Sequence, residues 1–461
     1  MLRFCKENKE SVINKMRDGQ LDAVCPSMTG FVDEIMLTMH DYGILKCLSD
    51  GIPDKRKANT TVPFNLILAL SVAAKMKIHT SLTDIPFAIT DHRVLGKLGY
   101  AMFDADDDIN KGLMTEGSLR ALIKKYESPE LVECYNRTVQ NHIMPKLNIS
   151  ANIHILDCTD IEVNLKNKNY EDSAVVTNKY HQAARGYRLA SLRGVINDTG
   201  VIEEIRFGSI DIHDLELSRE MLYTSPMLKR GDAVVCDRGF LSREVMNYLK
   251  GKRGVDTYVP LRSNMNTFEM AVSTAKYDNK WIKHPTRKNQ RIALVTDLSE
   301  YYIGEDPENN VDLNACVVWD TKATEKDKEY FVFITTDLTK SAKQIIQTYE
   351  LRPEIEEDFR QIKDHWNIQD FRSKSLSITT FHIICVLFGY LFFQLYTMLP
   401  EGEQYAHKSL PAIAKNFISK PQTYLIFYVG CEFGILTLIE FAELFSACDA
   451  DVKDKFKHSM G

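Results

Sequence analysis

The chain has 461 residues, of which 44% are hydrophobic and 26% charged, so it can bury a sizeable core and is long enough for about three domains. The formal net charge of −6 argues against a strongly basic nucleic-acid-binding surface, unless basic residues cluster locally. Ten cysteines occur without a CxxC pair and mostly within apolar runs. This usage predicts buried thiols in a reducing compartment and excludes a disulfide framework or a cysteine zinc site.

Residues 1–148 have the apolar spacing of helices and form the first predicted domain. Residues 60–76, "TTVPFNLILALSVAAKM", are expected to be one of its apolar helices. Residues 104–112, "DADDDINKG", resemble a calcium loop in composition. However, Ile109 stands where such a loop requires glycine, so we interpret them as an acidic loop.

The pattern changes to alternating, β-branched segments near residue 150. Residues 152–163, "NIHILDCTDIEV", predict a strand, and the segments 186–198 and 201–209 predict a hairpin. Helices and two further short strands then alternate as far as Arg262. Mixed strands and alternating helices predict an α/β fold, in which a mixed sheet is flanked by helices. Residues 149–262 are assigned to the first part of this core.

The rest of the chain divides into three predicted regions. Residues 263–340 form a β-rich insertion with strands in the segments 291–298, 313–320 and 329–338. Residues 341–400 are the second part of the core, and residues 401–461 are a helical C-terminal region. Two apolar runs, 381–399 and 424–445, are interrupted by polar residues, so we interpret both as buried core helices and not as membrane spans.

Two aspartates follow predicted strands directly. Asp157 ends the run "IHIL", and Asp237 ends the run "AVVC". Reactive groups in open α/β sheets gather at such strand ends, although a strand-terminal aspartate is also a common turn residue or helix cap. Asp160 is the alternative first carboxylate, but Asp157 continues the alternation of the strand. Oxygen ligands of this type are what Mg²⁺ prefers.

The helical stretch "YELRPEIEEDFRQIK", residues 349–363, supplies a third carboxylate. At ~100° per residue, Tyr349, Arg352, Glu356 and Lys363 fall within about a 60° wedge beside an apolar stripe. The neighbouring acidic residues Glu354, Glu357 and Asp358 are expected to face solvent. An ordinary salt-bridged helix face is the alternative. Pro353 suits the first turn of a helix, so the helix is expected to begin there, with Tyr349 and Arg352 on the preceding turn.

This stretch resembles the Tyr-x2-Arg-x3-Glu-x6-Lys (YREK) signature of insertion-sequence DDE transposases. The segments "LDCTD", "GYRL", "IDIHDLE", "VVCDRGFLS" and "YVPLR" are similar to successive blocks of that family, in the same order. The resemblance covers about residues 150–400. It implies an RNase H-like core, with the 263–340 region as the family's β-rich insertion.

The resemblance implies that Asp157, Asp237 and Glu356 are the catalytic, metal-binding triad for two Mg²⁺ ions, for which Mn²⁺ can substitute. Two such ions clamp the attacking and leaving oxygens of a phosphodiester displacement. The function implied is cutting of transposon ends and joining of the freed 3′-hydroxyls to target DNA. The expected partners are the terminal inverted repeats, target DNA and a second copy of the chain in a synaptic homodimer, without a membrane.

Six residues are expected to contact DNA. The resemblance assigns Tyr349, Arg352 and Lys363 to phosphates at the transposon end. Arg262, which follows a strand, and Arg238, next to Asp237, are further phosphate candidates. Residues 276–291 hold six Lys or Arg against one Asp, and Trp281 lies among them. Trp281 is expected either to stack on an extruded base or to be a core aromatic of the insertion.

Two other functions remain open at this level. One is a domesticated, non-catalytic DNA-binding protein of the same fold. The other is a phosphatase that uses "DCTD" as a phospho-aspartate loop, although Thr159 stands where that loop requires a second aspartate. The N-terminus lacks the apolar run of a signal peptide. A cytoplasmic location is therefore expected, associated with the nucleoid if the source is prokaryotic.

Overall fold

A computed structural model describes residues 5–57, 62–89, 91–99, 114–177, 181–196, 199–298, 310–324, 328–406, 413 and 422–459. The acidic loop predicted at 104–112 lies outside these residues. The chain divides into two compact units. One unit comprises Met1–Cys134 with Ile362–Gly461, and the other comprises Tyr135–Gln361.

The second unit is built on a mixed sheet, as the sequence predicts. Five of its strands lie in the order β6-β5-β3-β7-β8. Strand β3 is parallel to β7, and β7 is parallel to β8, whereas β5 and β6 are antiparallel to their neighbours. The short strand β4 pairs with the first four residues of β5. The bounds are β3 Ile153–Val163, β4 Ala174–Thr177, β5 Ala183–Ile196, β6 Thr199–Ser209, β7 Ala233–Cys236 and β8 Asp256–Pro260.

The insertion continues this sheet. Strand β12 pairs antiparallel with β8 and is followed outward by β11, β10 and β9. The three strands expected in the insertion are confirmed, and a helix, α11, precedes them. The bounds are α11 Asn266–Asp278, β9 Ile282–Lys283, β10 Gln290–Val295, β11 Asn314–Asp320 and β12 Tyr330–Thr335. The insertion and those five strands therefore share one hydrogen-bonded sheet.

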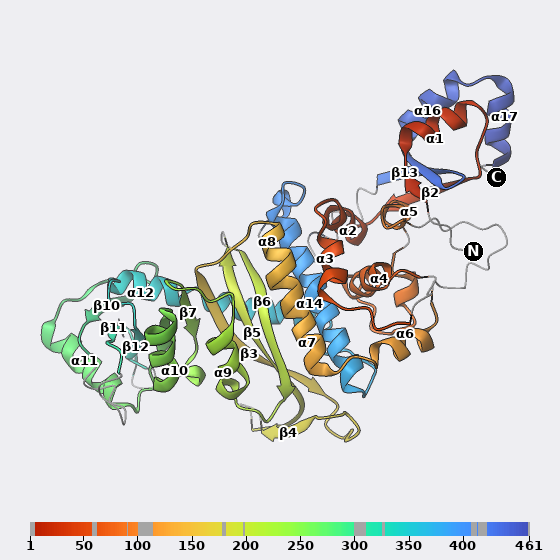
Figure 1. Cartoon of the computed structure of the whole chain (residues 1–461). Helices are drawn as coiled ribbons and strands as arrows, with labels where there is room; N and C mark the ends of the chain where they lie inside the picture. Colours follow the sequence, from red (N-terminus) through yellow and green to blue (C-terminus); the bar gives the residue numbers. More distant parts are fainter. Residues whose placement is uncertain are drawn as a thin grey trace. The chain divides into compact units, whose positions relative to one another are not determined.

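Helices cover both faces of the sheet because strand residues alternate between two cores. Leu156 and Val234 belong to a core that includes α9 Asp214–Thr224, α10 Arg243–Tyr248 and α11. Their neighbours Ile155 and Val235 belong to a second core with α12 Ala342–Tyr349 and α13 Pro353–His365. Figure 1 shows these strands and helices in the yellow, green and cyan part of the chain.

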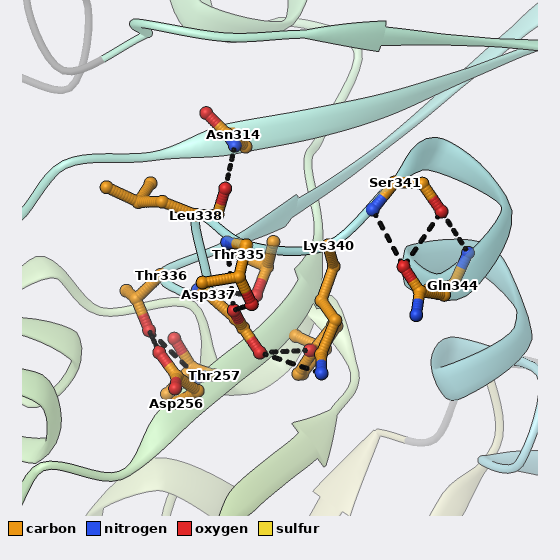
Figure 2. Close-up of polar contacts among 12 residues, drawn as sticks. Asp256, Thr257, Asn314, Thr335, Thr336, Asp337, Leu338, Lys340, Ser341 and Gln344 are labelled. Atoms are coloured by element: carbon orange, nitrogen blue, oxygen red, sulfur yellow. Dashed lines mark hydrogen bonds and ion pairs between the residues drawn. The ribbon is translucent and has the colours of Figure 1, made fainter. Parts of the chain in front are cut away.

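A polar network fixes the turn that leads from β12 back to α12 (Figure 2). Thr336 donates to Asp256 Oδ1 at 2.8 Å and accepts from the Thr257 backbone N–H at 3.1 Å. Ser341 then caps α12 in a capping box with Gln344. These contacts tie the end of the insertion to β8 and start the helix that leads to Arg352 and Glu356.

The first unit is mostly helical in its described residues. Its apolar helices are α2 Phe31–Asp41, α3 Ile44–Gly51, α4 Phe64–Met76 and α14 Leu376–Met398. Among the described residues, α14 is the one helix long and apolar enough to cross a membrane, and 89% of its most apolar window is buried inside the protein. The interpretation of 381–399 as a buried core helix is therefore confirmed.

A second sheet in this unit corrects two expectations. Residues 424–445 are not one helix: they form β13 Gln422–Val429, β14 Glu432–Thr437 and helix α16 Leu438–Ala447. Nor is the N-terminal region wholly helical, because β2 Ala23–Thr29 pairs with β13, and β1 Lys6–Glu7 pairs with β14. The physical reason is local: "TYLIFYV" is rich in β-branched and aromatic residues, and Gly430 adopts φ +61° in the turn that follows.

Candidate active site at the ends of two parallel strands

The two predicted aspartates are brought together by strand register. Asp237 directly follows β7, as predicted, but Asp157 lies in the middle of β3 and not at its end, because β3 continues to Val163 in antiparallel pairing with β5. Leu156 of β3 lies opposite Cys236 in the last pair between β3 and β7. Asp157 and Asp237 are the residues that follow this pair. Asp157 is 9% exposed, and its Oδ1 accepts the Cys158 backbone N–H at 2.8 Å. Asp237 is half-buried and caps the short helix Arg238–Phe240 by accepting the Gly239 N–H at 2.5 Å. The capping role expected as an alternative is thus present at Asp237, together with its place beside Asp157.

The third carboxylate comes from the break between α12 and α13. Tyr349 is the last residue of α12, and α13 begins at Pro353, as predicted. Arg352 lies in the connecting turn, and Glu356 lies in the first turn of α13. Tyr349 packs its ring 4.5 Å from the ring of Phe333 on β12. Because α13 begins only at Pro353, Arg352 lies in the turn between the two helices. From there its side chain reaches Asp157 of β3.

One guanidinium links all three carboxylates. Arg352 donates from Nη2 to Asp157 Oδ2 at 2.7 Å and from Nη1 to Glu356 Oε1 at 2.5 Å. The same Nη2 lies 3.9 Å from Asp237 Oδ2. The structure therefore gathers Asp157, Asp237 and Glu356 around one cation, although they are far apart in the sequence.

Burial and crowding change the protonation of this cluster. Burial raises the pKa of Asp157 to about 6, and the nearby charges of Asp237 and Glu356 add to this effect, whereas Arg352 and the Cys158 N–H oppose it. For Arg352, burial favours the neutral form, but the attraction of the carboxylates outweighs it and raises the pKa. Burial also raises the pKa of Tyr349 to about 12, so its phenol is neutral at physiological pH.

The alternative carboxylate Asp160 has a different partner. Its Oδ1 accepts from Arg188 Nε at 3.0 Å, and Arg188 Nη1 lies 3.0 Å from Asp214 Oδ1. Arg188 also donates to the backbone carbonyl of Ile212. Asp160 therefore belongs to an ion-pair network of its own, whereas Asp157 contacts Arg352.

A second ion cluster on α13 was not foreseen from the sequence. Asp358, expected to face solvent, is 6% exposed and accepts from Arg193 Nε at 2.6 Å. Glu354 lies 2.7 Å from Nη1 of the same arginine, whereas Glu357 is exposed as predicted. The expectation for Asp358 is wrong because the partner, Arg193 on β5, is far away in sequence and cannot be inferred from helix periodicity.

The other predicted DNA contacts lie on separate elements. Arg238 and Arg262 are exposed, and Arg262 Nη2 lies 3.5 Å from the Arg238 carbonyl, so both lie near the end of β7. Lys363 lies on α13, seven residues after Glu356. Trp281 is partly buried in the insertion, with its ring 5.4 Å from Trp319 and in contact with the core of that face.

The oxygen ligands of Asp157, Asp237 and Glu356 suit a hard divalent cation. These three carboxylates offer only oxygen ligands, which Mg²⁺ and Mn²⁺ prefer. They leave two negative charges uncompensated, since three carboxylates face one guanidinium. As they stand, no three His, Cys, Asp or Glu side chains among the described residues are placed to hold one metal ion. The chemistry of the residues therefore fits the metal, while the present arrangement is organised around Arg352.

Comparison with known proteins agrees with this geometry. The family described as "Transposase DDE domain" matches residues 151–392, more than half of the chain. This range includes Asp157 and Asp237, the insertion and α13. A comparison with individually curated proteins finds no match. The mixed sheet with its flanking helices is the RNase H-like fold of that domain, and the chain belongs to the DDE transposase family.

Proposed function

We propose that this chain is a catalytically active insertion-sequence transposase, which cuts the ends of its element and joins them to target DNA. Membership of the family makes DNA the substrate. The observation that carries the proposal is the gathering of Asp157 from β3, Asp237 from the end of β7 and Glu356 from α13 around one guanidinium. Asp157 is buried, Asp237 is half-buried and Glu356 is exposed, so the charge of Asp157 in particular is costly at this place unless it is paired.

The residues of the site would divide between metal binding and phosphate contacts. Asp157, Asp237 and Glu356 would hold two Mg²⁺ ions, which when bound lower the pKa of water and stabilise charge on the phosphate. Arg352, Tyr349 and Lys363 would position the phosphates of the transposon end. Arg238 and Arg262, exposed near the end of β7, would contact the adjoining backbone.

The reaction would proceed in two displacements at phosphorus. Water first attacks the phosphodiester at the transposon end, the P–O3′ bond breaks, and a 3′-hydroxyl is released. That hydroxyl then attacks a phosphodiester of the target, so that a new P–O3′ bond forms as a target bond breaks. A homodimer holding two ends together would be needed to join both, and the expected location is the cytoplasm or nucleoid.

Trp281 keeps two interpretations. Its contacts with Trp319 and with the core of the insertion favour a structural role. Its partial exposure within the basic segment 276–291 still allows stacking on an extruded base.

The test is cleavage of labelled duplexes that carry the inverted repeats flanking the gene, in Mg²⁺. Asp237→Asn should reduce cleavage by more than about a hundredfold, because changing even a group that only orients a metal ligand costs ~10–100-fold. Asp160→Asn is the matched control, since Asp160 lies on the same strand as Asp157 but pairs with Arg188, and it should retain cleavage. Undiminished cleavage by Asp237→Asn would refute the triad. Binding of these ends without cleavage by the unmodified chain would favour the domesticated protein.

A further inference from the structure

Arg352 has no free Nη group in this structure. Nη1 is bound to Glu356 and Nη2 to Asp157, with Asp237 close to the second. Its remaining donor, Nε, is buried and has no hydrogen-bond partner in the described part of the chain. Both outer nitrogens of the guanidinium thus face carboxylates, and each donates one hydrogen bond to them.

The pairing has an electrostatic consequence for the free protein. Three carboxylates that converge repel one another, and a guanidinium, which stays protonated in proteins, offsets part of that repulsion. Arg352 therefore holds the three side chains together in the absence of any other cation.

These contacts compete with the binding of a divalent metal to the carboxylates and of a DNA phosphate to Arg352. Asp157 Oδ2 and Glu356 Oε1 are among the oxygens that would ligate a divalent ion, and a fixed positive charge lies within 2.7 Å of both. A cation between them would be repelled by the guanidinium. A DNA phosphate that accepts a bidentate contact from Arg352 would draw the guanidinium away from these carboxylates.

We propose that Arg352 is the resident counter-cation of the carboxylate cluster and competes with divalent metal until a DNA phosphate withdraws it. Metal binding and DNA binding are then coupled, and by reciprocity each raises the affinity for the other. The inference rests on the proposed function, because it takes the three carboxylates as the metal ligands.

The direct test measures Mn²⁺ binding by electron paramagnetic resonance without DNA. Arg352→Gln should bind Mn²⁺ at least about tenfold more tightly than the unmodified chain, which is ~1.4 kcal/mol. Arg360→Gln is the matched control, because Arg360 lies on α13 together with Glu356 but pairs with the exposed Glu357, and the Mn²⁺ affinity of this variant should be unchanged. Arg352→Met serves as a second uncharged variant if the glutamine variant does not fold, as judged by circular dichroism.

A second measurement uses the unmodified chain. A short duplex carrying the inverted repeat should raise its Mn²⁺ affinity, with the background of DNA-bound Mn²⁺ taken from an Asp157→Asn, Asp237→Asn double variant. The rise should be smaller in Arg352→Gln, which has no guanidinium to withdraw.

The outcomes separate the two claims. Equal or weaker Mn²⁺ binding by both Arg352 variants, with that binding still lost in Asp237→Asn, would overturn the counter-cation role and leave the metal site intact. An Asp157→Asn, Asp237→Asn protein that binds Mn²⁺ as well as the unmodified chain would reject the metal site itself, and the inference with it.

Discussion

At the scale of single residues, a buried histidine in the second unit lies between two carboxylates. His154, near the start of β3, is fully buried, with Nδ1 2.8 Å from Glu203 Oε2 on β6. Its Nε2 lies 3.4 Å from Oδ2 of Asp232, just before β7. Burial opposes the charged imidazolium, but Asp232 and Glu203 outweigh it and raise the pKa of His154 to about 9.

This cluster predicts a pH dependence of stability. Because the folded pKa exceeds the unfolded value of ~6.5, the stabilisation is complete below pH 6.5 and is lost as the pH rises through 9. The shift corresponds to about 3 kcal/mol. The measurement is the urea unfolding free energy of the unmodified chain minus that of His154→Gln, taken at pH 6 and pH 10. We expect this difference to shrink at pH 10, and a constant difference would contradict the ion cluster.

At the scale of elements, helix α13 is held to the sheet by Arg193. This residue of β5 is 4% exposed and pairs with both Asp358 and Glu354 of α13. Gly200 on β6 makes room for it, since a Cβ there would lie 1.9 Å from Arg193 Cζ. The position of Glu356, between these two acidic residues on the same helix, therefore depends on an ion cluster outside the site.

Removing this anchor should destabilise the second unit. Arg193→Leu removes the arginine cation from the buried Asp358, and breaking a buried ion pair costs ~3–5 kcal/mol. Gly200→Ala forces the guanidinium to move, at a cost of ~1–3 kcal/mol. Gly251→Ala is the control, because a Cβ there meets nothing within 4 Å, and its stability should be unchanged or slightly higher. Unfolding midpoints test these values, and hydrogen exchange of residues 353–365 should rise in the first two variants alone.

At the scale of the whole molecule, the two ends of the chain form one structure. Strands β1 and β2 from the N-terminal segment pair with β14 and β13 from the C-terminal segment. Helix α1 Lys9–Arg17 and helix α17 Ala450–Ser459 contribute to the same core, in which Val12, Met16 and Phe456 are fully buried. The first and last segments therefore depend on each other for burial of their apolar side chains.

This dependence can be measured across the length of the chain. Phe456→Ala should cost ~3–5 kcal/mol by leaving a cavity in this core. Hydrogen exchange should then increase in Lys9–Arg17, although that helix is about 440 residues away in sequence. Lys457→Ala, at the next and exposed position, should leave exchange unchanged. Protection of Lys9–Arg17 that is the same in both variants would contradict a shared core.

The sequence by itself determined what depends on neighbouring residues. The apolar run before Asp237 predicted that this residue follows β7, and the restricted φ of Pro353 predicted where α13 begins, whereas Asp157, also expected at a strand end, lies within the longer β3. Strand alternation predicted the strands of the insertion. These features follow from local periodicity and backbone restriction, so the mixed α/β core was predictable, and the family match agrees with it.

Only the tertiary structure decided which distant residues form ion pairs and which distant strands pair. Arg352 contacts Asp157 across 195 residues of sequence, and Arg193 contacts Asp358 across 165. Neither pair can be predicted from the spacing of neighbouring residues. The strand character of β13 is likewise supported by its distant partner β2. A charge or an apolar run takes its final environment from whichever remote element packs on it, and packing is a property of the whole fold.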